Sequence, residues 1–144
     1  MGCDIHMYVE KKVKNEWKVV KGPNSYYGKY EWEKDKMRFD WIYNGRNYDL
    51  FAFLADVRNY KGKIKPLALP KELPEDKSEF VAQIAEGWQW DGHSYSHFTL
   101  KELKESKPKD DEVREVITVI TKLLQDVQEE DSEEDIRIVF WFDN

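Results

Sequence analysis

The chain has 144 residues, a size typical of one domain, and its formal net charge is −6. Aromatic residues make up 15% and hydrophobic residues 40%, which argues against a disordered chain. No apolar run approaches the roughly 20 residues that a membrane-spanning helix needs, and the N-terminus lacks the pattern of a secretion signal. The single cysteine, Cys3, cannot form an internal disulfide, which fits a reducing cytoplasm. Composition therefore predicts one cytoplasmic domain over residues 1–144, with no membrane partner.

Charge is distributed unevenly along the chain. Residues 1–66 carry 14 Lys and Arg against 9 Asp and Glu, whereas residues 67–144 carry 9 against 20. A protein that binds double-stranded nucleic acid should present a predominantly basic surface, so we do not expect that partner. Between Tyr26 and Tyr60, aromatic and basic residues interleave. That mixture suits a ligand with a base to stack and a phosphate to pair, although the same rings could instead fill the core.

Strand patterns occupy both ends of the chain. Residues 4–13 alternate with period two, and a turn leads from them into a second short strand at 17–20, which predicts a hairpin. Residues 136–142 predict a closing strand. Residues 38–43 predict a further strand that ends at Asn44-Gly45, a strong hairpin-turn signal.

Helical patterns lie between these strands. Apolar residues at helical spacing are clearest near the C-terminal end, and two capping boxes, Asp76 with Glu79 and Thr99 with Glu102, predict the starts of two short helices. The predicted helices are residues 48–59, a helix that begins at Asp76 and runs through Ala85, a helix that begins at Leu100, and residues 111–128.

No parallel βαβ unit is evident, so the order of elements predicts an α+β fold. We expect a single domain with a mostly antiparallel sheet that includes the N- and C-terminal strands, together with three to four helices. Residues 61–77 predict a loop, and the acidic run 129–135 predicts a solvated connection.

Two of the three histidines close an Asp-x-His triplet, Asp4-Ile5-His6 and Asp91-Gly92-His93. Residues i and i+2 of a strand share a face, so each triplet would present a carboxylate and an imidazole together. If the triplets meet in space, their oxygen and nitrogen ligands suit a divalent metal such as Zn or Mn, and the metal could activate a water. The candidate metal ligands and catalytic residues are therefore Asp4, His6, Asp91 and His93. His97 continues the alternation that runs through Asp91, His93 and Tyr95.

Polar residues near the second triplet suggest a phosphate site. A helix that starts at Leu100 would offer free N–H groups to an anion, and hydroxyl residues lead into it. A guanidinium at the end of the predicted helix 48–59 could add a charge-assisted clamp. The candidate phosphate-binding residues are Arg58, Asn59, Ser94, Ser96 and Thr99.

Each candidate also has a purely structural interpretation. The first triplet could serve the sheet alone, with its imidazole donating to a neighbouring strand and its carboxylate paired with a lysine. Asp91-Gly92 is a turn signal in its own right, and Ser96 or Thr99 could be only a helix cap. Arg58 could be an ordinary cation at a helix end.

Several stretches resemble a family of small phage and prophage proteins. The chain opens with Met1-Gly2-Cys3-Asp4-Ile5-His6 and closes with Phe140-Trp141-Phe142-Asp143-Asn144, as members of that family do. Further matching residues are Arg46-Asn47-Tyr48, Asp56-Val57-Arg58-Asn59, Leu73-Pro74 with Asp76 and Ser78, Asp91, His93-Ser94 with Ser96, Thr99-Leu100, and Glu102-Leu103. The resemblance implies a phage-encoded accessory protein in the cytoplasm of an infected bacterial host, and it implies that these motifs belong together. His97 departs from the hydrophobic or aromatic residue usual in the family, which argues against His97 as a ligand.

The leading hypothesis is a protein with a nucleotide- or phosphate-binding site that acts as a metal-dependent phosphodiesterase on a nucleotide. By analogy, the substrate would be a host nucleotide signal used in defence, which would make this an anti-defence protein. One alternative is a non-catalytic protein that sequesters the nucleotide in the same site without a metal. A second alternative is an acidic protein that binds and inhibits a host protein through residues 129–135 or the helix from Asp111.

Overall fold

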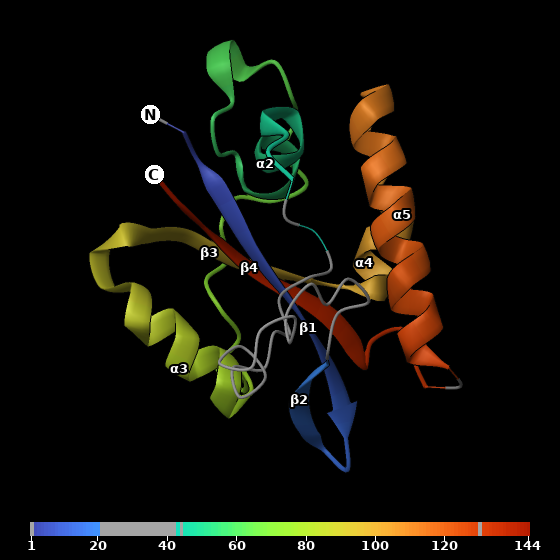
Figure 1. The fold of residues 1–144 in the computed structure, drawn as a ribbon. Coiled ribbons are helices and arrows are strands. Elements are labelled where there is room, and N and C mark those ends of the chain that lie inside the picture. The colour runs from blue at the N-terminus through green and yellow to red at the C-terminus, as the bar shows by residue number, and fades with distance from the viewer. Residues whose placement is uncertain (1, 21–42, 44, 130) are drawn as a thin grey trace, which may run out of the picture.

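A four-stranded antiparallel sheet with the strand order β2-β1-β4-β3 forms the centre of the structure (Figure 1). The computed structural model describes residues 2–20, 43, 45–129 and 131–144. The strands are β1 (Asp4–Val13), β2 (Glu16–Val20), β3 (Gly92–Thr99) and β4 (Ile136–Asp143). The predicted hairpin and closing strand are confirmed, whereas the strand predicted at 38–43 falls, except for Tyr43, outside the described residues, and so does the Asn44 of its turn.

The helices of the described residues lie between β2 and β4 along the chain. They are α2 (Tyr48–Ala55), α3 (Glu79–Trp88), α4 (Leu100–Glu105) and α5 (Asp111–Gln128), with single 3₁₀ turns at Tyr60–Gly62 and Gln89–Asp91. Together with the antiparallel sheet and its two terminal strands, these helices confirm the α+β class predicted from the sequence. None of the helices in the described part of the chain is long and apolar enough to cross a membrane.

Two helix boundaries differ from those predicted. Helix α2 ends at Ala55 because Asp56 takes a left-handed conformation with φ of 57°, and the Asp56 N–H closes the last turn. Helix α3 is capped by Ser78, whose side chain accepts a hydrogen bond from the Val81 N–H. Asp76, the predicted cap, instead contacts residues of the sheet. The capping box that opens α4 is present as predicted.

The two faces of the sheet bury two separate hydrophobic clusters. On one face, Ile5, Met7 and Phe140 belong to a large core that also includes buried residues of α2, α4 and α5. On the other face, Tyr8 and Trp141 pack against α3. We call these the α2 face and the α3 face. Strand β4 lies between β1 and β3 and is buried on both faces, from Ile136 through Phe142.

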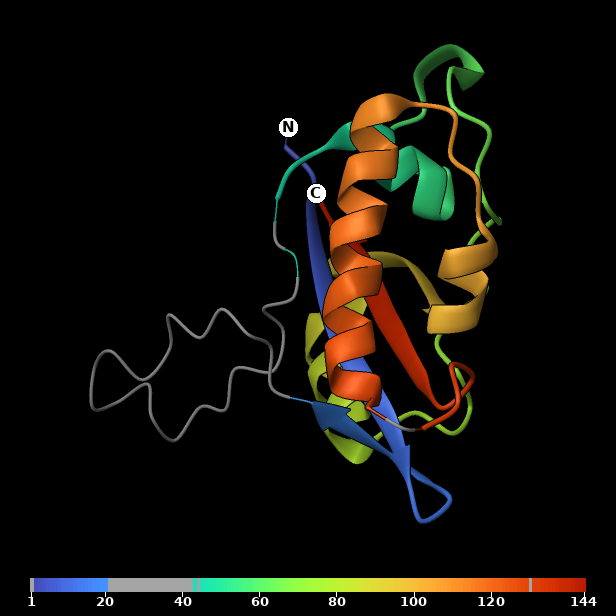
Figure 2. The same cartoon turned by 90° about the vertical axis from the view of Figure 1, so that its right-hand side faces the viewer.

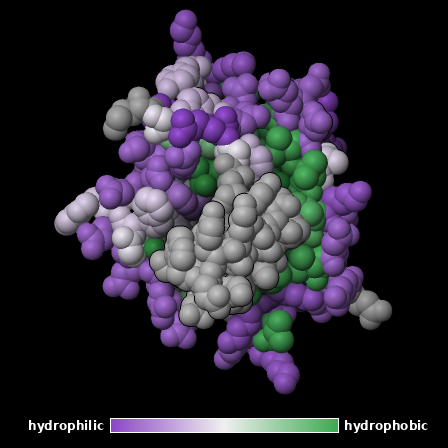
Figure 3. Space-filling model, viewed as in Figure 1, coloured by the Kyte–Doolittle hydropathy of each residue, from purple (hydrophilic) through white to green (hydrophobic). Residues whose placement is uncertain are grey.

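Helix α5 runs along the α2-face side of the sheet (Figure 2). Its predicted apolar stripe packs into the core through Val113, Ile117, Ile120 and Leu124. On the surface shown in Figure 3, apolar side chains gather along α5, where Val119 is 54% exposed, while most of the other described surface is hydrophilic.

The described residues of the acidic connection before β4 are exposed or half-buried, as expected of a solvated segment, and ion pairs also tie them to the domain. Asp131 forms an ion pair with Lys11, Glu133 with Lys104, and Glu134 with Lys101. These lysines lie on β1 and α4, so opposite charges hold this part of the acidic run against both elements.

The strand register brings both Asp-x-His triplets to the same end of the sheet. Asp143 lies opposite Asp4 of β1 and also opposite Gly92 of β3. Strands β1 and β3 therefore both begin where β4 ends, and the two chain ends lie close together there (Figure 1). Any site that used both triplets would have to form at this end.

Candidate functional site

A β-bulge in β3 decides which way the second triplet faces. The register with β4 shifts between His93 and Ser96, so that Ser94 and Tyr95 lie opposite a single residue of β4. Ser94 has a φ of 56°, and a left-handed first residue is typical of one class of bulge. The extra residue breaks the alternation predicted from Asp91 to His97. His93 and Tyr95 consequently point to opposite faces of the sheet.

His6 and His93 lie on opposite faces of the sheet. His6 is directly opposite Trp141, whose side chain packs on the α3 face. His93 is opposite Phe142, which packs on the α2 face, and the two ring centroids are 6.2 Å apart. Opposed residues of antiparallel strands project to the same side, so β4 and its side chains separate the two imidazoles.

The expected joint metal and catalytic site is therefore not assembled. Within the described ranges, no group of three or more His, Cys, Asp and Glu side chains is placed to hold a metal ion. The side chains of Asp4, His6, Asp91 and His93 thus do not fit one divalent cation. The physical reason is the combination of a central strand between the triplets and a bulge that turns one of them over.

The first triplet makes contacts at the edge of the α3 face. The Asp4 carboxylate accepts hydrogen bonds from the Arg46 guanidinium at 3.0 and 2.8 Å, both to Oδ1. The His6 Nε2 atom lies 2.7 Å from Asp143 Oδ2, and the imidazole packs against the Trp88 ring at a centroid distance of 4.3 Å. The structural interpretation of the first triplet paired Asp4 with a lysine. In the structure Asp4 does form an ion pair, but its partner is Arg46.

In the second triplet, Asp91 ends the 3₁₀ turn before β3 and is exposed.

Arg58 and His93 meet at the side chain of Asn144. Arg58 Nη2 donates to Asn144 Oδ1 at 3.3 Å, and His93 Nε2 lies 3.2 Å from the same oxygen. On the other side of its ring, His93 Nδ1 lies 3.0 Å from Ser94 Oγ. Three predicted site residues, Arg58, His93 and Ser94, are therefore brought together at the end of the sheet.

Two tyrosines complete this group of side chains. The Arg58 guanidinium lies 5.5 Å from the centre of the Tyr48 ring and donates through Nη1 to the Tyr60 hydroxyl at 3.2 Å. That hydrogen bond from Arg58 to Tyr60 raises the pKa of Arg58 above its ordinary value. Tyr60 is 63% exposed, so its ring is open to a ligand. We call Tyr48, Arg58, Tyr60, His93, Ser94 and Asn144 the Arg58 cluster.

The other predicted phosphate ligands hold the fold together instead. Asn59 donates to Asp56 and closes the following loop through two hydrogen bonds to the Ile64 backbone. The Ser96 side chain is buried and accepts the Lys71 N–H at 3.2 Å.

Thr99 is likewise a structural residue. It caps α4, a helix of 6 residues, and Glu102 in turn accepts the Thr99 N–H at 3.0 Å. The capping box uses the N–H groups of Thr99 and Glu102, and the Lys101 N–H donates to the Glu133 carbonyl at 3.2 Å, so the phosphate site expected at this N-terminus is not supported.

Sequence reasoning did not select Arg46, Tyr48, Asp143 or Asn144 as site residues, although each contacts one that it did select. All four belong to stretches that carry the resemblance described above. Their place in these stretches was the signal that could have pointed to the four residues. Spacing along the chain could not show which side chains they would contact.

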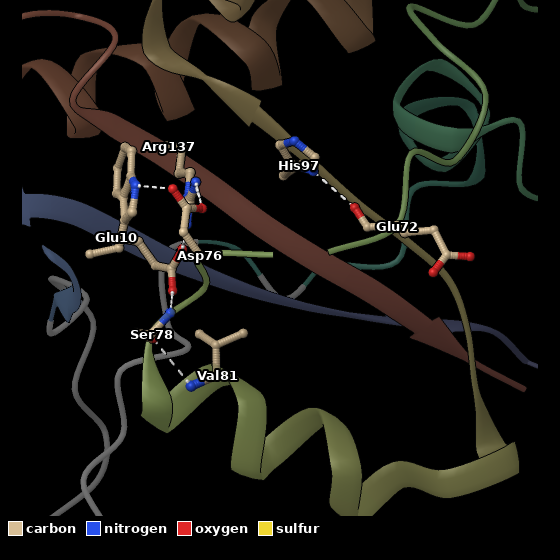
Figure 4. A network of polar contacts seen from close by, with 8 residues as sticks. Glu10, Glu72, Asp76, Ser78, Val81, His97 and Arg137 are labelled. Atoms are coloured by element: carbon tan, nitrogen blue, oxygen red, sulfur yellow. Dashed lines mark hydrogen bonds and ion pairs between the residues drawn. The ribbon is translucent and has the colours of Figure 1, made fainter. Parts of the chain in front are cut away.

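A buried ionic network on the α3 face has a structural role (Figure 4). Arg137 donates to Glu10 at 2.8 Å and to Asp76 at 3.0 Å, while Glu10 accepts the Ser78 N–H at 2.6 Å. The guanidinium also stacks on the Trp17 ring at 3.7 Å. These contacts join β1, β2 and β4 to the start of α3.

His97 lies on the same face as this network. Its Nδ1 atom is 2.9 Å from the Glu72 carbonyl oxygen (Figure 4). Burial lowers the pKa of His97, although the bond to the Glu72 carbonyl acts in the opposite direction. His97 therefore ties the loop before α3 to the edge strand β3.

Comparison with known proteins gives no relative on which to base a function. No protein family matches the chain, and neither a curated protein nor a solved structure matches it.

Proposed function

We propose that this protein binds a phosphate-bearing nucleotide at the Arg58 cluster and holds it without hydrolysing it. The observation that carries this proposal is the meeting of Arg58 and His93 at one oxygen, Asn144 Oδ1. A guanidinium and an imidazole that share a neutral acceptor offer the same donors to a phosphate oxygen, and the bonds become charge-assisted when the acceptor is an anion. The phosphate would displace the Asn144 amide.

The Arg58 cluster also offers contacts for the other parts of a nucleotide. Arginine carries five N–H donors, and the contacts to Tyr60 and Asn144 leave others for a phosphate. The exposed Tyr60 ring offers a face on which a base can stack, an interaction worth about 1–3 kcal/mol per base. Ser94, bonded to His93, would fix the orientation of the imidazole.

The separation of the two triplets favours sequestration over the metal-dependent phosphodiesterase. The hydrolase hypothesis needs His6 and His93 at one phosphate, and they project from opposite faces of the sheet. The hypothesis that the protein inhibits a host protein through residues 129–135 receives less support, because lysines of the same chain pair with Asp131, Glu133 and Glu134.

In the setting that the family resemblance implies, this binding would serve a phage-encoded accessory protein in the cytoplasm of an infected bacterium. Its ligand would be a host nucleotide signal, and removal of that signal would give the protein an anti-defence role. The resemblance supports this setting, and the Arg58 cluster supports the class of ligand.

Calorimetric titration with cyclic mono- and dinucleotides, AMP, adenosine and inorganic phosphate tests the proposal. We expect a phosphorylated nucleotide to bind, and Arg58→Gln and His93→Asn to weaken its binding by roughly 10- to 150-fold each, the equivalent of one charge-assisted hydrogen bond. His6→Asn is the matched control on the opposite face and should leave affinity unchanged.

Two results would overturn the proposal. Equal losses in His6→Asn and His93→Asn would mean that the Arg58 cluster is not the binding site. Chromatography of the ligand after incubation distinguishes the mechanisms, since a cleaved product would establish a hydrolase and an unchanged nucleotide would support sequestration.

A further inference from the structure

A groove separate from the Arg58 cluster opens between the loop after α2 and the start of α5. Its volume is about 1040 Å³, and its walls come from residues between Phe53 and Leu67 and between Lys107 and Val113. Both walls lie at the same end of the molecule (Figure 2). The volume is near the upper end of the range of about 300–1,000 Å³ found for small-molecule sites.

The groove has an apolar floor. Phe53 and Val113 are core residues at its base, and Leu67, Pro66 and Pro108 extend this apolar surface. The polar side chain of Asn59 also lines the groove, but its hydrogen bonds are already made within the loop. The floor therefore suits a hydrocarbon or aromatic body better than a sugar, which would need free hydrogen-bonding groups.

The rim of the groove is positively charged. Four lysines line it, and one of them, Lys63, is paired with Asp49 at 3.1 Å. Within the described part of the chain the other three, Lys65, Lys107 and Lys109, form no ion pair.

The two carboxylates of the lining are engaged elsewhere. Asp56 accepts from the Asn59 amide at 2.8 Å, and Asp110 caps α5 by accepting the Val113 N–H at 3.0 Å. Both carboxylates keep their charge, and the four lysines of the lining, counted against Asp56, Asp110 and the Asp49 that pairs with Lys63, leave one net positive charge at the groove.

Hydrogen bonds hold both walls in place before any ligand arrives. Arg114 donates to the Pro108 carbonyl at 3.2 and 3.1 Å and to the Lys109 carbonyl at 3.1 Å. On the opposite wall, Asn59 bonds to the Ile64 backbone through both its amide nitrogen and its oxygen. A groove with fixed walls loses little conformational entropy on binding, which favours its use as a site.

We infer that this groove binds an amphiphilic organic anion. The apolar body would lie on the floor beside Phe53 and Val113, and a carboxylate or phosphate head would lie among Lys65, Lys107 and Lys109. Fatty acids and alkyl phosphates share this chemistry. The inference stands apart from the nucleotide proposal, since the groove and the Arg58 cluster share no residue.

A fluorescence titration with 8-anilino-1-naphthalenesulfonate, an aromatic anion, tests the inference on the whole chain. Displacement of the dye is then measured with dodecanoate and dodecyl phosphate, against neutral dodecyl maltoside and cationic dodecyltrimethylammonium, all below micelle formation. We expect both anions to displace the dye and the neutral and cationic amphiphiles to displace it at least tenfold less well. The ratio of the two anions' affinities identifies the preferred head group.

Charge reversal locates the site. The double variant Lys107→Glu/Lys109→Glu should weaken dye binding about tenfold at low ionic strength, because two rim attractions become repulsions. The control, Lys14→Glu/Lys122→Glu, makes the same change in net charge at the β1–β2 turn and on exposed α5, and should bind as the native chain does. Circular dichroism confirms the fold of each variant, and Lys107→Gln/Lys109→Gln replaces the first variant if it unfolds.

Three results would overturn the inference. They are the absence of dye binding by the folded native chain, equal losses in the groove variant and in its control, and equal displacement by neutral and anionic amphiphiles.

Discussion

Arg137 and Glu10 form an ion pair from which water is almost excluded. Their side chains are 6% and 0% exposed, and Arg137 Nε lies 2.8 Å from Glu10 Oε1. The pair lies on opposed positions of β4 and β1, and its partners at Asp76 and Ser78 connect the sheet to α3. Removal of either side chain would leave the other buried without its partner. The stability of this face therefore depends on both residues.

Arg137→Met should therefore lower the free energy of unfolding by about 3–5 kcal/mol, since Glu10 would remain buried and charged. Urea denaturation measures the change. The double variant Glu10→Leu/Arg137→Met should recover part of the loss, because it removes both charges but leaves the buried Ser78 N–H without its Glu10 acceptor. Lys18→Met, which breaks the exposed pair with Glu16, should cost less than about 1 kcal/mol. A loss no greater in Arg137→Met than in Lys18→Met would contradict the structural role of the network.

Stability should fall in acid because of Asp76. Burial alone would raise the pKa of its carboxyl, but the hydrogen bond and charge of Arg137, together with the Trp17 N–H, hold that pKa below its ordinary value. The folded state therefore binds the proton more weakly than the unfolded state, whose aspartates titrate near about 3.9. The Asp76 contribution is present above that pH and is lost as the pH falls through the lowered folded pKa. Asp76→Asn should flatten the stability profile measured between pH 5 and pH 2.5, chosen as roughly spanning this titration.

We predict a second pH dependence of stability, nearer neutral pH, that arises from His97. Its pKa is lowered chiefly by burial and also by the charges of Lys71 and Arg137, against the opposing bond to Glu72. The unfolded chain therefore takes up the proton first, near a pH of about 6.5, and stability declines from there down to the folded pKa. His97→Phe should remove this part of the decline between about pH 7.5 and 5.5. Identical slopes for the variant and the native chain would show that His97 does not titrate in this environment.

The cap of α3 can be tested directly. Ser78→Ala should lower the free energy of unfolding by about 1 kcal/mol, because the Val81 N–H loses its acceptor at the helix start. Hydrogen exchange of the amides in the first turn of α3 should quicken as well. Ser78→Thr retains the hydroxyl and is the control. Faster exchange in both variants would mean that the hydroxyl is not what protects this turn.

The two triplet histidines should behave as independent sites. Because β4 lies between them, the stability changes of His6→Ala and His93→Ala should add to within about 0.5 kcal/mol in the double variant. Thermal or urea unfolding of the four proteins completes the cycle. A coupling energy above about 1 kcal/mol would place the imidazoles in contact or in one shared network.

Local sequence patterns were sufficient to predict most of the helices and strands. The alternation in β1, the apolar stripe of α5 and the Thr99–Glu102 capping box each depend on neighbours within a few residues, and all three are present. The true end of α2 was missed because it depends on the left-handed conformation of Asp56. The cap of α3 was misplaced because Arg137, distant in sequence, recruits the Asp76 carboxylate.

The sequence by itself determined the α+β class and the strands at both ends, and it predicted Arg58, His93 and Ser94 as site residues, which stays a prediction. Only the tertiary structure decided that these three meet at Asn144 while His6 faces the other side of the sheet. The face that a side chain occupies depends on the register with the partner strand, and one extra residue at Ser94 reverses it. Register is set by long-range pairing, so spacing within the triplets could not reveal it.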